Sequence, residues 1–98
     1  MQFLVIAYDG TDEGAAARRA AAREAHLKAF MDMREKGRFL YGAAILSDEG
    51  RMIGSMVVCD FASREELDDA WLRHEPYVVG GVWKTIDVKR AQVPTRPA

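Results

Sequence analysis

Cysteine is almost missing from this chain, because Cys59 is the one thiol in 98 residues. A lone cysteine forms no intrachain disulfide and cannot by itself build a thiolate metal site, which excludes a disulfide scaffold and a cysteine-ligated metal domain. No apolar run approaches the roughly 20 residues that a membrane-spanning helix needs. The glycine-rich motifs that bind phosphate groups are also missing, so nothing in the sequence indicates a nucleotide site.

An excess of charge of either sign is missing too. The 14 basic and 15 acidic side chains leave a formal net charge of −1, and no segment combines clustered lysine or arginine with aromatic residues. We therefore expect neither nucleic acid nor a membrane as a partner. Met1 is followed at once by an apolar strand pattern and then by Asp9 and Asp12, so we expect no secretory leader and a cytoplasmic protein.

The composition that remains is that of a folded domain, with 49% apolar and 30% charged residues. The length suits one domain, so we expect residues 1–98 to form a single unit. The segment 92–98 holds Pro94 and Pro97, and we expect it to be a loose tail.

Apolar periodicity and turn residues predict four strands and two helices. The stretch 13–36 is rich in strong helix formers, and Gly37 is placed to close that helix. Ser63 and Glu66 form a capping box that opens a second helix, which Pro76 is expected to end. The predicted strands are 2–8, 38–46, 51–61 and 82–91. This βαββαβ order predicts an α+β fold in which two helices cover one face of an antiparallel four-stranded sheet.

Two of these strands are apolar on both sides. In the first strand, one side carries Phe3, Val5 and Ala7, and the other carries Leu4, Ile6 and Tyr8. The third strand, 51–61, shows the same two-sided pattern. An antiparallel sheet with one face in water should alternate apolar and polar residues instead. We therefore expect the helix-free face to be buried against a second copy of the chain, in a homodimer.

Several short patterns, in order along nearly the whole chain, carry a family resemblance. They are Arg23-Glu24-Ala25-His26-Leu27, Lys36-Gly37-Arg38-Phe39-Leu40, Gly42, Gly54-Ser55 and Glu75-Pro76-Tyr77-Val78-Val79-Gly80-Gly81-Val82. Together they resemble the YCII family. The resemblance implies a ferredoxin-like domain of the dimeric α/β barrel type, with a pocket that holds a His–carboxylate pair proposed as catalytic. The family's histidine falls on His26. Its carboxylate is typically an Asp before Pro and an aromatic residue, and that position here is Glu75, one methylene longer.

The residues themselves allow two interpretations of this pair. His26 shares a largely apolar helix stripe with Phe30, where a partly solvated imidazole could exchange protons or simply bond a backbone carbonyl. Glu75 precedes Pro76 and is held extended, so its carboxylate can point back and orient a histidine. The alternative is an exposed acid at the end of a helix.

Other residues are assigned with their alternatives beside them. Arg23, Ser55 and Tyr77 are the expected substrate-binding residues, although a serine in a strand is often structural. We interpret His74 as packed helix surface. The two histidines and Glu75 lack the spacing of helix-borne zinc sites, so no metal is expected. The charged run of Arg18, Arg19, Arg23 and Glu24 is typical of a solvated helix face.

Two functions fit this pattern. The first is an acid–base enzyme, in which His26 moves a proton, Glu75 orients it and Arg23 holds an anionic or phenolate oxygen. Its reaction would be a lyase, isomerase or dehydrohalogenase step on a small molecule, and it would need no cofactor. This expectation depends mainly on the family resemblance, because fold alone does not imply function. The second is a non-catalytic dimeric module that binds a small ligand or regulates a partner.

Overall fold

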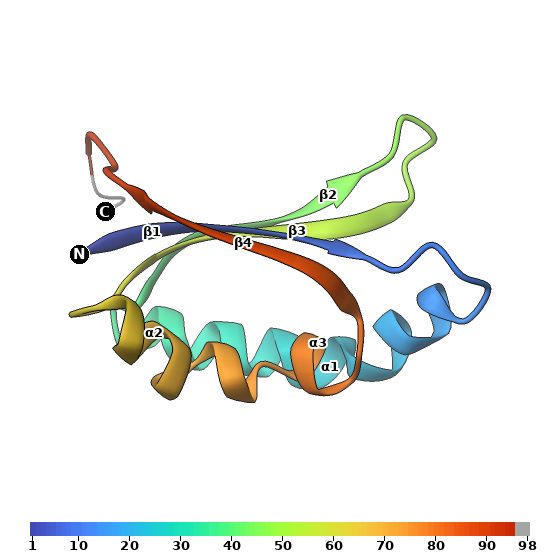
Figure 1. Ribbon diagram of the computed structural model, residues 1–98, viewed down its shortest axis with the longest axis horizontal. Coiled ribbons are helices and arrows are strands. Elements are labelled where there is room, and N and C mark those ends of the chain that lie inside the picture. The colour runs from blue at the N-terminus through green and yellow to red at the C-terminus, as the bar shows by residue number, and fades with distance from the viewer. Residues whose placement is uncertain (96–98) are drawn as a thin grey trace.

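The computed structural model describes residues 1–95, and its element order is the predicted one (Figure 1). The strands are β1 (Gln2–Asp9), β2 (Phe39–Leu46), β3 (Met52–Asp60) and β4 (Trp83–Ala91). The helices are α1 (Ala15–Glu35), α2 (Arg64–Ala70), the 3-10 turn η1 (Leu72–His74) and α3 (Pro76–Val79). Within these residues, no helix is both long enough and apolar enough to cross a membrane.

The four strands form one antiparallel sheet in the order β2-β3-β1-β4. The register places Val5 of β1 opposite Val57 of β3 on one side and Val88 of β4 on the other. All the helices lie against one face of this sheet, and the other face is bare (Figure 1). The predicted α+β fold of ferredoxin-like βαββαβ type is therefore confirmed.

The core lies between the helices and the covered face of the sheet. Phe3, Val5 and Ala7 of β1 are at most 2% exposed there. Leu67 and Trp71 from the second helical segment pack against the same cluster. Burying large apolar side chains is the main favourable term in folding. The core therefore fixes the distance between α1 and the sheet, and with it the space in which a ligand can lie.

The second helical segment differs from the prediction that one helix runs until Pro76. α2 ends at Ala70, η1 follows, and Pro76 begins α3 instead of ending a helix. Proline is tolerated at the first helical position because its missing N–H has no partner there. Glu75 caps α3 by accepting a hydrogen bond from the backbone N–H of Tyr77. His74, predicted to be packed, is exposed because it ends η1 on the outer side.

Two chain segments show how the ends of elements are fixed. Gly37 follows α1 with a φ of 74°, the left-handed conformation that glycine adopts most readily, as its predicted closing role requires. At the start of the predicted tail, the backbone N–H of Val93 donates to the side-chain oxygen of Gln2 at 2.6 Å. The last part of that tail, residues 96–98, lies outside the described residues.

Candidate active site

The structure brings His26 and Glu75 together, although 49 positions separate them in the chain. His26 lies near the middle of α1, and Glu75 lies in the joint between η1 and α3. Nδ1 of His26 and Oε1 of Glu75 are hydrogen-bonded. Both side chains are buried, Glu75 almost completely, at 1% exposure. The alternative of an exposed helix-terminal acid is therefore wrong.

Three donors converge on the Glu75 carboxylate. Besides the imidazole, the indole N–H of Trp71 donates to Oε2 at 2.7 Å, and the backbone N–H of Tyr77 donates to Oε1 at 3.3 Å. A carboxylate held by donors acts as an acceptor, so we assign the proton of the imidazole contact to Nδ1 of His26. Nε2 is then the ring nitrogen available for proton exchange. Trp71 was not predicted as a site residue, although its position four residues before Glu75 is a signal that could have identified it.

Aromatic rings hold the imidazole in place. His26 stacks on the ring of Tyr77, with 3.9 Å between centroids and 10° between planes. The indole of Trp83 meets the imidazole edge-on at 6.1 Å. Burial raises the pKa of the Tyr77 phenol, and the positive charges of Arg19 and Arg23 partly oppose that rise. The stacked phenol is therefore neutral near physiological pH.

A second buried cluster surrounds Arg19, which the sequence analysis placed on a solvated helix face. This prediction is wrong, because the Arg19 side chain is 8% exposed and points toward the sheet. Its Nη1 donates to both carboxylate oxygens of Asp9, at 2.9 Å each. Its Nη2 donates to the carbonyl of Gly54 at 3.2 Å and to Oγ of Ser55 at 3.1 Å. Among residues 1–95, Nε of Arg19 is the one buried side-chain nitrogen or oxygen without a hydrogen-bond partner.

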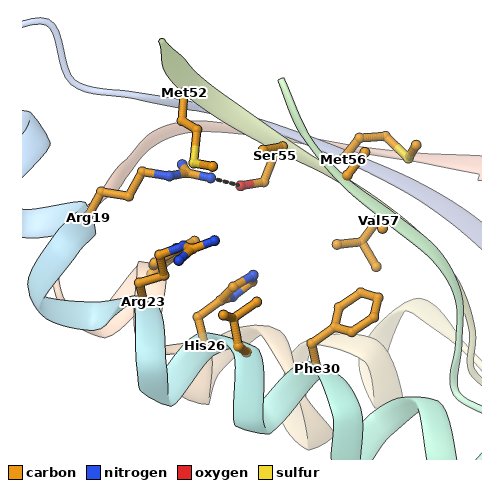
Figure 2. A pocket seen from close by; sticks show the side chains of 13 residues that line it. Arg19, Arg23, His26, Phe30, Met52, Ser55, Met56 and Val57 are labelled. Carbon is orange, nitrogen blue, oxygen red and sulfur yellow. Dashed lines mark hydrogen bonds between the residues drawn. The ribbon is translucent and has the colours of Figure 1, made fainter. Parts of the chain in front are cut away.

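A cavity of about 210 Å³ lies between α1 and the strands β2 and β3. Its wall includes all the predicted site residues except Glu75: Arg23, His26, Ser55 and Tyr77. Phe30 and Val57 supply an apolar end, and Figure 2 shows the His26 ring directed into the space between them and Arg23. Pockets for drug-sized ligands measure about 300–1,000 Å³, so this one suits a smaller, single-ring molecule.

A second, larger hollow of about 700 Å³ adjoins the cavity and shares Arg19, Arg23 and Met52 with it. It extends over the loop after β1 and is bordered by Arg51. The cavity is therefore open on the side of the two arginines. In the part of the chain that the structure describes, no three His, Cys, Asp or Glu side chains gather as metal ligands do.

Comparison with known proteins agrees with the fold and the motifs. A sequence profile of the YCII-related domain matches residues 1–92. The protein YciI of Escherichia coli O6:H1 (strain CFT073) is 32% identical over 95 residues, which covers 91% of this chain and 94% of that protein. The protein YciI of Shigella flexneri matches with the same identity and coverage.

Two solved structures share the fold. One is the 5-chloro-2-hydroxyhydroquinone dehydrochlorinase TftG from Burkholderia phenoliruptrix AC1100, in complex with 2,5-dihydroxybenzoquinone. It superposes with a TM-score of 0.79 at 22% identity, over 94% of each chain. The other is Rv0793 from Mycobacterium tuberculosis, with a TM-score of 0.52 at 14% identity, again over 94% of each chain. At these identities the likeness concerns the fold alone.

Proposed function

This chain belongs to the family of YCII-related domains, and from that premise we propose that it is an acid–base enzyme acting on a small molecule. His26 exchanges the proton, and Glu75 orients the imidazole. One observation supports this proposal above the others: the imidazole is fixed at Nδ1 by a buried carboxylate while its ring faces an open cavity. A general base needs this combination of a fixed orientation and access to a substrate.

The chemistry follows from the geometry of the pair. With Nδ1–H donated to Glu75, Nε2 of His26 carries a lone pair that can remove a proton from a bound substrate. The imidazolium that forms is stabilised by the carboxylate behind it. A lyase, isomerase or dehydrohalogenase step can begin with such a proton transfer, and in an isomerase step the imidazolium returns the proton at another position. Loss of a proton and a halide from one molecule is balanced without an oxidant or a reductant.

The remaining wall residues receive binding roles in this proposal. Arg23 lies one turn before His26 on α1 and lines the cavity, where its guanidinium can hold a negatively charged oxygen. Ser55 and Tyr77, which also line this space, carry hydroxyl groups that could bind a substrate oxygen. A hydroxylated aromatic ring is the substrate type that these groups suit. TftG, which shares the fold, dehydrochlorinates such a ring, so its substrate is the first compound to test.

The experiment measures chloride release from 5-chloro-2-hydroxyhydroquinone, with related halogenated phenols as further substrates. We expect His26→Asn to lower the rate by about 10²–10⁴-fold, the usual contribution of a general base. Glu75→Gln should also lower it, because an amide cannot hold the imidazole in the same way.

The matched control is His74→Asn, which makes the same change at an exposed histidine outside the cavity. Full activity of His26→Asn would refute the role of His26. Tight binding of these phenols without turnover of any of them would favour the non-catalytic ligand-binding module.

We also propose that the bare face of the sheet is covered by a second copy of this chain. In the register of the sheet, three of the strands carry a continuous apolar set on that face: Leu4, Ile6, Tyr8, Tyr41, Ala43, Ile45, Met56 and Val58. The edge strand β4 adds the polar residues Thr85, Asp87 and Lys89. Tyr8 is 45% exposed in the single chain. A bare apolar face of this kind typically marks an interaction surface.

Sedimentation at micromolar concentration tests the proposed homodimer. We expect a dimer for the native chain and a monomer for Ile6→Lys, which places a charge in the centre of the face. Val79→Lys is the control, because Val79 is an exposed apolar residue on α3, away from that face. A native chain that sediments as a folded monomer would contradict the proposal.

A further inference from the structure

Basic residues line the cavity, and the carboxylates that pair with them lie behind its wall. The ionic residues in its wall are all basic and come from α1: Arg19, Arg23 and His26. The two carboxylates that pair with them, Asp9 on β1 and Glu75 before α3, are absent from the wall. A ligand in the cavity therefore meets basic groups first and acidic groups only behind them.

Pairing leaves one of these charges uncompensated. Arg19 is neutralised by Asp9, and His26 is bonded to Glu75. Within the described residues 1–95, Arg23 forms no hydrogen bond or ion pair with any side chain. Tyr77 on α3 stays neutral, and the wall residues from β2 and β3 are uncharged. The guanidinium of Arg23 is thus free to balance a negative charge on a ligand.

Ser55 supplies a donor whose direction is fixed by its neighbours. Its Oγ accepts from Nη2 of Arg19 at 3.1 Å and from the indole N–H of Trp83 at 3.2 Å. Guanidinium and indole groups donate only, so both lone pairs of the hydroxyl are used. The hydroxyl proton must therefore point elsewhere, and Ser55 lines the cavity (Figure 2). Acceptance from a cationic donor also makes that proton a stronger donor.

We propose that the cavity selects the deprotonated form of a small phenol or enol, whose oxyanion accepts from the Ser55 hydroxyl and pairs with Arg23. This inference depends on the proposed function only in taking the cavity as the ligand site. Oxyanions that form during proton abstraction are stabilised by donors arranged beforehand, as these are. A neutral phenol would gain the hydrogen bond but not the charge interaction.

The experiment uses 4-nitrophenol, because its ionised form absorbs visible light and its neutral form does not. The bound probe is titrated by absorbance beside the free probe. We expect the pKa of the bound phenol to fall by at least one unit, which means that the phenolate binds about tenfold or more tightly than the phenol. 4-Nitroanisole, which has no ionisable hydroxyl, should compete poorly.

Two variants assign the effect to its residues. Arg23→Gln, at an exposed position that the core does not need, should remove most of the preference for the phenolate. Ser55→Ala should weaken binding of the phenolate more than binding of the anisole. Arg34→Gln is the matched control, because Arg34 is an exposed arginine of the same helix outside the cavity.

Several results would overturn the inference. An unchanged or raised pKa of the bound probe would do so, as would an Arg23→Gln variant that keeps the preference, or no saturable binding at millimolar probe. The measurement needs no turnover, so its outcome is distinguishable from that of the chloride assay. A cavity that prefers the phenolate in a protein without activity in the chloride assay would favour the ligand-binding module over the proposed enzyme and leave this inference standing.

Discussion

Two buried carboxylates lie behind the cavity, and they hold their basic partners in different ways. Asp9 uses both oxygens on a single nitrogen of Arg19. Glu75 divides its oxygens among an imidazole, an indole and a backbone amide. Arginine keeps its proton at any physiological pH, so the first pair is permanent. Histidine is the side chain that gains and loses a proton near neutral pH, so the second pair can take part in proton transfer.

The two pairs therefore differ in role: the Arg19 pair positions other groups, whereas the His26 pair contains a group that can exchange a proton. Arg19 fixes Ser55 and the carbonyl of Gly54, and its guanidinium lies 4.8 Å from the centre of the Tyr77 ring. It therefore ties α1 to β3 and α3 and positions the wall of the cavity. His26 is also held in a fixed position, but its partner, the Glu75 carboxylate, can accept a hydrogen bond from either the neutral imidazole or the imidazolium. Substitutions in each pair should therefore affect different measurements.

The largest effect on stability is expected from Asp9→Asn. It leaves the Arg19 charge buried without a counter-charge, and breaking a buried ion pair costs about 3–5 kcal/mol. The free energy of unfolding in urea, compared with that of the native chain, measures this loss. A loss below about 1 kcal/mol, which is typical of surface pairs, would mean that the pair is not the permanent tie that we infer.

A smaller effect is expected from removing an indole donor from each cluster. Trp71→Phe removes a bond to the Glu75 carboxylate, and Trp83→Phe removes a bond to the neutral hydroxyl of Ser55. Both variants lose the same volume from a buried ring, so each is the control for the other. Hydrogen bonds to charged groups contribute about 1.5–3 kcal/mol and neutral ones about 0.5–1.5 kcal/mol.

Trp71→Phe should therefore unfold more easily than Trp83→Phe, by about 1 kcal/mol. The two unfolding curves, recorded under the same conditions, give the difference directly. Equal losses, or a larger loss for Trp83→Phe, would show that Glu75 does not depend on its indole donor.

The smallest effect is expected from Asp12→Asn, the same change as Asp9→Asn in an exposed pair. The Arg18 guanidinium beside Asp12 holds the pKa of that carboxyl well below its ordinary value of 3.8. A lowered pKa in the folded state stabilises the protein above the unfolded value, and this contribution is lost as the pH falls below about 4. The free energy of unfolding of the native chain should be slightly higher than that of the variant at neutral pH, and the two values should converge in acid.

Added salt provides the control for this pair, because it screens exposed charges and should also reduce the difference in stability between the native chain and Asp12→Asn. Stability curves between neutral and acid pH test the prediction. A difference that persists at the lowest pH at which both chains fold would assign the effect to something other than the ion pair.

Much of the fold could be predicted because its signals are local. Apolar runs marked the four strands, and the Ser63 hydroxyl does accept from the backbone N–H of Glu66, as the predicted capping box requires. Pro76 was misread because proline both ends helices and begins them. The side chain that decides between these outcomes is Glu75, which caps α3 only once its carboxylate is buried. That burial is a property of the tertiary structure.

The site divides in the same way. His26 and Glu75 were predicted from motifs, and the fold unites them. Arg19 was not predicted as a buried residue, because a basic residue in a charged run is expected to be solvated unless its partners are known. Those partners, Asp9 and Ser55, come from two different strands. No local pattern contains them, so the cluster becomes visible only when the sheet is assembled.

The cap of α3 has a consequence for the dynamics of the site. One carboxylate both begins this four-residue helix and holds the imidazole, and the next residue but one, Tyr77, stacks on that imidazole. Local opening of α3 would therefore release the imidazole and its stacking partner in the same event, as one cooperative unit. The rate at which the Tyr77 amide exchanges with deuterated solvent then reports how often the imidazole loses its orientation, without any substrate present.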